Sequence, residues 1–380
     1  MTIQLSVGPR VRKSPFYDAS VAAGLSHATI YNHMYMPVAY GDPEAEYWRL
    51  IQDVSIWDVA VERQVEVWGP DAETLVQYLV PRDLSKFFIG QGKYVPVCDH
   101  RGVLLNDPVL SKLDQGRYWF SIADNDLLMW VRAVAAERKF NVSVTEPDAS
   151  PLAIQGPKAE ALISGLLGDW VQGLKYFWFQ EADLDGIPLL VARSGWSKQG
   201  GFELYLLDQS RGTDLWNRVF EAGKPYNVGP GAPNYIERVE SALLSVGADT
   251  DDMTNPFEVD LGKYVHTEIA VDYIGRDALR RIQDEGPKRR RIGVIVEGTK
   301  LPPNQHRWPV TLHGEQVGEV TASAFSPRLD QNIGLANVHA DIADGAGLLV
   351  ETEQGHRAAT VTALPFITPP DQRKLGAPRT

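Results

Sequence analysis

The stretch ARSGWSKQGGFELYLL, residues 192–207, decides the fold assignment because it predicts a hairpin whose returning strand has two different faces. Side chains alternate across a strand, so Phe202, Leu204 and Leu206 are expected in the core, with Glu203 and Tyr205 on the opposite face. If that second face met only water, Glu203 would be an ordinary exposed carboxylate. The alternative is that this face binds a ligand.

The turn of the same hairpin favours the ligand interpretation. Gly200 and Gly201 allow another backbone or a ligand to approach closely, and Trp196 offers a flat apolar wall with one N–H donor. A carboxylate such as Glu203 has two acceptor oxygens. An aromatic wall beside a carboxylate therefore suits a flat heterocycle that carries several N–H donors.

The composition describes a globular protein with more than one packed unit. The 380 residues exceed the ~250 to 300 at which single cores stop growing, and 44% are hydrophobic while 23% are charged. A net charge of -12 argues against a nucleic-acid surface. The one basic run, residues 288–291, is interpreted as a solvated segment between two domains.

Cysteine and hydropathy patterns indicate the compartment. Cys98 is the single cysteine, so no internal disulfide can form, and the eight histidines show no metal-ligand pair. The start lacks an apolar run of secretory length, and nowhere do ~18 uncharged apolar residues follow one another. We expect a cytoplasmic protein with no membrane partner and no metal.

Helical and strand-like patterns alternate up to about residue 285, which predicts an α+β core, 1–285, of two subdomains. Residues 71–80 and 126–138 have helical apolar spacing, whereas 63–69, 117–123 and 187–193 have the pattern of strands. Short strand-like runs separated by turn residues then predict an all-β domain, 290–368. The proline-rich end, 369–380, is expected to be a flexible tail.

Two further segments carry candidate site residues. In 231–247 a helix is predicted with Asn234 as N-cap, and Arg238 lies in its first turns. Arg238 either pairs with Glu237, Glu240 or another carboxylate, or it contacts a ligand.

Asn106 and Asp107 end a second predicted strand–turn–strand segment, 92–110. Adjacent strand residues point to opposite faces, so only one of the two can face a given pocket.

These segments together resemble the glycine-cleavage aminomethyltransferase superfamily of tetrahydrofolate-dependent enzymes. The resemblance covers about residues 30–340. It is carried by MPVAY (36–40), WDV (57–59), IQGPKA (154–159), GWSKQGGFE (195–203), RVESAL (238–243) and NPFEVDLG (255–262). Within the superfamily the chain is most similar to the dimethylsulfoniopropionate demethylases, through TIYNHM (29–34), PRDLSK (81–86), LLNDPV (104–109) and IERVESALLS (236–245).

The resemblance implies a three-domain, cloverleaf-like molecule with a C-terminal β-barrel and with tetrahydrofolate, the methyl acceptor, in its central opening. By matching motif positions, Glu203 would hold the pterin edge, Arg238 would lie near the cofactor or substrate, and Tyr94 and Trp196 would wall the pocket. Tyr205 becomes a neighbour of the reacting centre.

Three positions depart from the family pattern. Asn106 stands where aminomethyltransferases carry a functional Asp, Trp196 replaces Tyr, and DVAVE in place of DVSHM puts Glu62 where the family has Met. Asparagine cannot exchange a proton, which puts carboxylate-dependent chemistry in doubt.

Methyl transfer from a sulfonium needs no acid, since the leaving group is a neutral thioether. The sequence therefore predicts a demethylase of dimethylsulfoniopropionate or a close relative, with Asn106, Trp196 and Tyr205 at the reacting centre. Lys198, Lys263 or Arg238 would receive a substrate carboxylate.

Other functions and assemblies remain open. One alternative is a same-fold enzyme acting on a methylated amine, a methoxyaromatic or the aminomethyl group of glycine cleavage, and another is a non-catalytic folate-binding protein. The oligomeric state is also open, with a homodimer among the options.

Overall fold

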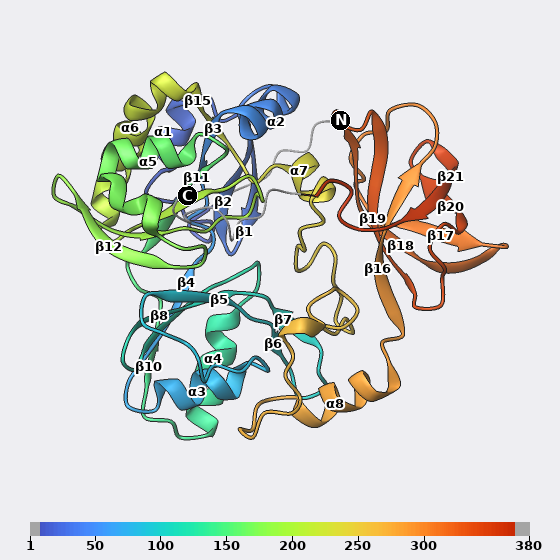
Figure 1. The fold of residues 1–380 in the computed structure, drawn as a ribbon, viewed down its shortest axis with the longest axis horizontal. Helices are drawn as coiled ribbons and strands as arrows, with labels where there is room; N and C mark the ends of the chain where they lie inside the picture. Colours follow the sequence, from blue (N-terminus) through green and yellow to red (C-terminus); the bar gives the residue numbers. More distant parts are fainter. Residues whose placement is uncertain (1–7, 369–380) are drawn as a thin grey trace.

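The computed structural model describes residues 8–368, so the predicted tail, 369–380, lies outside the described residues. Figure 1 shows three lobes: two mixed lobes on one side and a barrel on the other. The fold class predicted from the sequence, α+β with a C-terminal β-barrel, is confirmed.

The first lobe is built on a six-stranded sheet in the order β12-β13-β14-β11-β3-β15. Its strands are β12 (Phe179–Leu184), β13 (Ile187–Ala192), β14 (Gly201–Leu206), β11 (Ser150–Gln155), β3 (Val54–Asp58) and β15 (Val228–Gly231). The lobe also contains α1 (Tyr17–Ala22), α2 (Pro43–Gln52), α5 (Ala159–Leu167), α6 (Gly212–Gly223) and the hairpin of β1 (His27–Tyr31) and β2 (Met34–Ala39).

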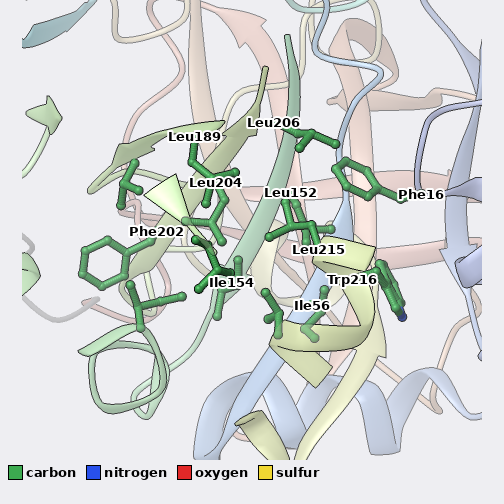
Figure 2. Packing of buried hydrophobic residues seen from close by; sticks show 14 of the residues in the cluster. Phe16, Ile56, Leu152, Ile154, Leu189, Phe202, Leu204, Leu206, Leu215 and Trp216 are labelled. Carbon is green, nitrogen blue, oxygen red and sulfur yellow. The ribbon is translucent and has the colours of Figure 1, made fainter. Parts of the chain in front are cut away.

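Strand β14 has the alternation that the sequence predicts. Phe202, Leu204 and Leu206 are fully buried in the core of this lobe, where they pack with residues of β11 and α6 (Figure 2). Tyr205, on the other face, packs in a separate small cluster with Trp119. One face of β14 therefore belongs to the main core of this lobe, and the other face contacts the second lobe through Trp119.

The second lobe holds a five-stranded sheet in the order β10-β4-β9-β8-β5. Its strands are β10 (Ser143–Thr145), β4 (Gln64–Trp68), β9 (Arg117–Ser121), β8 (Val109–Asp114) and β5 (Gln91–Tyr94). The predicted helices of this region form α3 (Ala72–Leu79) and α4 (Leu127–Glu137), and a short hairpin joins β6 (Val97–Cys98) to β7 (Leu104–Asn106). Apolar faces of α3 and α4 cover the core of this sheet.

The third lobe is a closed six-stranded barrel in the order β16-β19-β18-β17-β20-β21, with β21 paired back to β16. The strands are β16 (Arg289–Val296), β17 (Trp308–Leu312), β18 (Glu315–Ser326), β19 (Gln331–His339), β20 (Gly347–Thr352) and β21 (Gly355–Thr362). Closure leaves no unpaired strand edge in the ring. A connection containing α7 (Tyr235–Glu240) and α8 (Arg276–Glu285) leads from the first lobe past the second to the barrel (Figure 1).

One predicted element is much shorter than expected. Asn234 caps α7 as predicted, its side chain accepting the Glu237 amide at 3.1 Å, but the helix ends at Glu240 instead of reaching residue 247. Ala242 adopts a left-handed conformation with φ 53°, and the Leu243 amide bonds back to the Arg238 carbonyl. The apolar spacing misled because its residues serve two different cores: Val239 packs on the barrel and Val246 packs on the second lobe's side.

Candidate functional site

Glu203 lies in the middle of β14, opposite Ala153 of β11 and Ala192 of β13. Its side chain is only 6% exposed. The Ser194 hydroxyl donates a hydrogen bond to Oε2, and the Tyr205 hydroxyl donates a longer one at 3.4 Å. Burial raises the pKa of Glu203, and these two hydroxyls oppose that shift in part. The carboxylate therefore faces inward, with hydroxyl partners alone, as the ligand interpretation of the hairpin requires.

Two more carboxylates lie near Glu203. Burial raises the pKa of Glu62 well above its ordinary value, and the charges of Glu203 and Asp107 add to that shift. Burial also raises the pKa of Asp107 to about 7, although the Tyr94 hydroxyl donates to it at 2.5 Å. We call Glu62, Asp107 and Glu203 the carboxylate cluster. Across residues 8–368, none of the three has an Arg or Lys partner within 4 Å.

Tyrosines line the carboxylate cluster. Burial raises the pKa of Tyr31, Tyr176 and Tyr205, and the nearby carboxylates raise it further, so all three keep their hydroxyl protons. The rings of Tyr94 and Tyr264 meet edge to face with centroids 5.5 Å apart. A cluster of carboxylates among aromatic faces attracts cations and N–H donors.

Asn106 and Asp107 point in different directions, as the sequence predicts for neighbours on a strand. The Asn106 amide donates to the Ala123 carbonyl at 3.1 Å, and its carbonyl accepts the Ala123 amide at 3.0 Å. The side chain is fully buried, with both polar atoms bound to the main chain. Asn106 thus holds its strand against residue 123, and Asp107 is the member that joins the carboxylate cluster. A role of Asn106 at the reacting centre stays a prediction.

The loop before β14 carries Trp196 and Lys198, both half-buried. Ser197 anchors this loop by donating to Gln155 Oε1 at 2.7 Å. Gly201 has φ 148°, and a Cβ there would lie 2.2 Å from the Ile154 carbonyl oxygen, so this glycine admits a neighbouring backbone. Lys263, by contrast, is exposed and lies over the Tyr264 ring.

Burial and nearby charges act on the pKa of Lys198 in opposite directions. Burial lowers its pKa, the charge of Lys263 lowers it further, and the charge of Glu237 opposes both. Glu237 also accepts a hydrogen bond from Gln199 at 2.9 Å, which ties the loop to α7. The two lysines predicted for a substrate carboxylate thus lie close enough for their charges to interact, and Lys198 shares its loop with Trp196.

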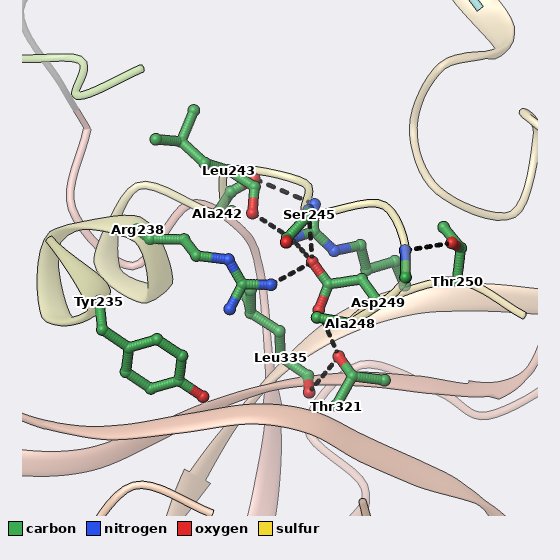
Figure 3. A network of polar contacts seen from close by, with 12 residues as sticks. Tyr235, Arg238, Ala242, Leu243, Ser245, Ala248, Asp249, Thr250, Thr321 and Leu335 are labelled. Carbon is green, nitrogen blue, oxygen red and sulfur yellow. Dashed lines mark hydrogen bonds and ion pairs between the residues drawn. The ribbon is translucent and has the colours of Figure 1, made fainter. Parts of the chain in front are cut away.

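Arg238 lies in an ion pair at the interface with the barrel (Figure 3). Its Nη2 donates to Asp249 Oδ2 at 2.5 Å, and Arg291 of β16 lies 3.5 Å from the same oxygen. Burial would raise the pKa of Asp249, but the two arginines hold it below its ordinary value. Of the two interpretations of Arg238, the structure shows the ion pair, with Asp249 as a partner that the sequence did not single out.

Four residues in or beside the carboxylate cluster were absent from the predicted site: Glu62, Tyr31, Tyr176 and Tyr264. They come from four separate segments of the chain, so no local spacing could bring them together. Glu62 alone carried a signal, because it departs from the family pattern. The tyrosines carried none, since buried tyrosines are common in any core.

Comparison with known proteins defines the class. Residues 16–268 match the GCVT N-terminal domain, and residues 289–367 match the glycine cleavage T-protein C-terminal barrel domain. The chain belongs to this family.

Individual relatives span nearly the whole chain. Dimethylsulfoniopropionate demethylase DmdA of Ruegeria pomeroyi is 44% identical over 353 residues, covering 93% of this chain and 96% of the relative. An aminomethyltransferase of Symbiobacterium thermophilum is 32% identical, covering 96% and 99%. The crystal structure of aminomethyltransferase T from Bartonella henselae shares the fold, with a TM-score of 0.84 at 23% identity, covering 94% and 98%.

No helix between residues 8 and 368 is long and apolar enough to cross a membrane. Within the same range, no group of three His, Cys, Asp or Glu side chains is arranged to hold a metal ion.

Proposed function

We propose that this protein is a tetrahydrofolate-dependent demethylase that moves a methyl group from a sulfonium donor, such as dimethylsulfoniopropionate, to N5 of tetrahydrofolate. The products are a thioether acid and 5-methyltetrahydrofolate. The 44% identity to a dimethylsulfoniopropionate demethylase over nearly the whole chain supports the donor class. The observation that carries the proposal is the buried Glu203 carboxylate, which accepts from two hydroxyls and has no Arg or Lys partner within residues 8–368.

The residues present fit a reduced folate. The pterin ring presents an N–H and an amino group side by side, and a carboxylate such as Glu203 can accept both in a bidentate way. The hydroxyls of Ser194 and Tyr205 fix that carboxylate in place. Tyr94 and Trp196 would supply aromatic faces for the flat ring.

The same cluster suits a cationic donor. Glu62 and Asp107 lie with Glu203 in the carboxylate cluster, where the charge of an entering cation would favour their ionised forms. Tyr205, Tyr31 and Tyr176 supply rings beside the cluster. Aromatic faces attract a cation by ~0.5 to 2 kcal/mol each without bonding to it. The donor is therefore drawn in while its methyl group stays reactive.

The chemistry is alignment rather than acid–base catalysis. Tetrahydrofolate supplies N5 as the nucleophile, and the departing thioether is neutral. The reaction therefore requires no proton from Asn106. This agrees with the structure, in which both polar atoms of the Asn106 amide are hydrogen-bonded to the main chain. Holding the reacting atoms in line can itself lower the barrier by ~7 kcal/mol or more.

The other residues predicted for the site would bind the methyl donor or the cofactor. Tyr205 and Trp196 position the donor, and Lys198 binds its carboxylate, because Lys198 is half-buried and shares its loop with Trp196. Lys263 is exposed and lies over the Tyr264 ring, and its contact with a substrate carboxylate stays a prediction. A contact of Arg238 with the cofactor stays a prediction, since its guanidinium is engaged by Asp249.

The wider assignments follow from the same proposal. The protein acts on small molecules in the cytoplasm and binds no nucleic acid, which its net charge of -12 supports. Residues 1–285 form the folate-binding core, and 290–368 form the barrel domain that packs against it.

A product screen tests the function. The purified protein is mixed with tetrahydrofolate and a sulfonium, a betaine or a methoxyaromatic donor, and 5-methyltetrahydrofolate is measured. We expect product from dimethylsulfoniopropionate. Product from an amine or ether alone would indicate a different demethylase, transfer of an aminomethyl group would indicate an aminomethyltransferase, and binding without any product would indicate a folate-binding protein.

A further inference from the structure

Glu237 is a buried carboxylate that has no role in the mechanism described above. It lies in the first turn of α7, outside the carboxylate cluster, and is fully buried. Its Oε1 accepts hydrogen bonds from Ser241 at 2.7 Å and from Gln199 at 2.9 Å. Its Oε2 is also buried and has no hydrogen-bond donor among residues 8–368. A buried acid with an unpartnered oxygen costs free energy, so packing alone does not account for it.

The partner Gln199 belongs to the loop of residues 195–201, which we call the substrate loop. This loop carries Trp196 and Lys198, the residues proposed to bind the methyl donor. Lys198 adopts a left-handed backbone conformation with φ 56°, which a residue other than glycine holds only when its surroundings enforce it. The hydrogen bond from Gln199 to Glu237 is one such restraint, and it holds the substrate loop against α7.

Glu237 also acts on Lys198 through its charge. Burial and the charge of Lys263 lower the pKa of Lys198, and the charge of Glu237 opposes both effects. Burial raises the pKa of Glu237 itself to about 7, while the charges of Glu240 and Arg328 act on it in opposite directions. Above neutral pH, ionised Glu237 therefore favours the charged form of Lys198.

Resting on the proposed function, we infer that Glu237 is a positioning residue for the methyl donor: its hydrogen bond orients the substrate loop, and its charge keeps Lys198 in the ammonium form. A donor such as dimethylsulfoniopropionate has a carboxylate at one end and a sulfonium at the other. The carboxylate requires a cation, and the sulfonium requires an aromatic face. Trp196 and Lys198 lie two residues apart, so fixing the loop fixes the spacing between these two groups. Glu237 acts through the loop and touches neither the donor nor the folate.

The pH profile of kcat/KM for dimethylsulfoniopropionate tests this inference in the variant Glu237→Gln. Because Oε2 accepts no hydrogen bond, the amide keeps the bonds to Gln199 and Ser241 and removes only the charge. The alkaline limb of the profile, where Lys198 loses its proton, should move to lower pH by about one unit. Folate affinity, measured by calorimetry, should stay unchanged.

Two further variants separate the hydrogen bond from the charge. Gln199→Leu breaks the contact between the loop and α7 but keeps the charge of Glu237. It should raise the KM for the donor about tenfold and leave the alkaline limb at its wild-type position. Ser241→Ala removes the other hydrogen bond to Oε1 without touching the loop, so its KM and its pH profile should match those of the wild type.

Combining Glu237→Gln with Lys198→Met shows whether the charge acts through the lysine. Without that ammonium, removing the charge of Glu237 should not move the alkaline limb any further. A shift of the same size in the Lys198→Met background, or a wild-type profile in Glu237→Gln, overturns the inference. An unchanged KM in Gln199→Leu overturns the part that concerns the hydrogen bond. A wild type that forms no 5-methyltetrahydrofolate refutes the proposed function, whereas normal turnover with an unshifted limb refutes the positioning role alone.

Discussion

Two groups of buried carboxylates have different kinds of partner, arginines in one group and hydroxyls in the other. At the interface between α7 and the barrel, Asp249 pairs with Arg238 and Arg291, and Glu240 pairs with Arg328, whose Nε lies 3.1 Å away. In the carboxylate cluster, the carboxylates of Glu203 and Asp107 have tyrosine and serine hydroxyls as partners. The first arrangement keeps the carboxylates charged at the contact between lobes, whereas the second raises the pKa of carboxyl groups that have no arginine or lysine partner among residues 8–368.

The difference separates structure from function. A buried acid with an arginine partner loses several kcal/mol of stabilisation when the partner is removed. An acid held only by hydroxyls gains from losing its charge, because the cost of desolvation disappears. Substitutions in the carboxylate cluster should therefore change ligand affinity more than stability, and substitutions at the interface should change stability more than ligand affinity.

The largest effect is expected at Glu203. Glu203→Ala removes two charge-assisted hydrogen bonds to the pterin, each about 1.5–3 kcal/mol, so tetrahydrofolate affinity falls by about a thousandfold. The free energy of unfolding stays equal or increases. Calorimetry and urea denaturation measure the two quantities, with Glu203→Gln as the isosteric control, and unchanged folate affinity in Glu203→Ala would refute the site.

A substitution at the interface of α7 with the barrel should reduce stability instead of folate affinity. Arg238→Met leaves Asp249 buried with a more distant arginine, so the free energy of unfolding falls by about 3–5 kcal/mol. Folate affinity of the folded protein changes little. Urea denaturation and folate titration decide the matter: normal stability with lost affinity would assign Arg238 to the cofactor instead of the interface.

Asn106 provides a smaller effect. Asn106→Asp replaces the amide that donates to the Ala123 carbonyl, and a carboxylate there faces an acceptor, which costs about 1–3 kcal/mol of stability. Folate affinity remains largely intact, because the side chain points away from the carboxylate cluster. A large loss of folate affinity without a loss of stability would place Asn106 in the ligand site.

The smallest effect is a pH dependence. Burial raises the pKa of Asp107 from 3.8 to about 7, so the folded state holds its proton more tightly than the unfolded state. The resulting stability is fully present below about pH 4 and is lost as pH rises through about 7. We expect the free energy of unfolding to fall by about 1 kcal/mol over this range, given partial solvation. Asp107→Asn should flatten the profile, and an equally steep profile in that variant would show that Asp107 does not titrate as described.

Sequence reasoning succeeded where periodicity was local. The alternation in β14 placed Phe202 and Leu204 in the core and Glu203 on the opposite face, and the spacing in α3 and α4 gave both helices. It failed for α7, because Val246 belongs to a different core from Val239.

Contacts between distant segments were out of reach from the sequence. Arg238 meets Asp249 eleven residues on and Arg291 on the barrel, and neither distance is fixed by local pattern. The approach of Glu62 to Glu203 depends on the order of strands in the first lobe's sheet, where β11 lies between β3 and β14. The sequence predicts that only one of Asn106 and Asp107 can face a given pocket. The fold shows that Asp107 is the one that faces the carboxylate cluster.

A crystal structure with bound tetrahydrofolate tests the central claim most directly. We predict that the Glu203 carboxylate accepts both N–H donors of the pterin edge. A pterin bound away from β14, with Glu203 still bonded only to Ser194 and Tyr205, would contradict it.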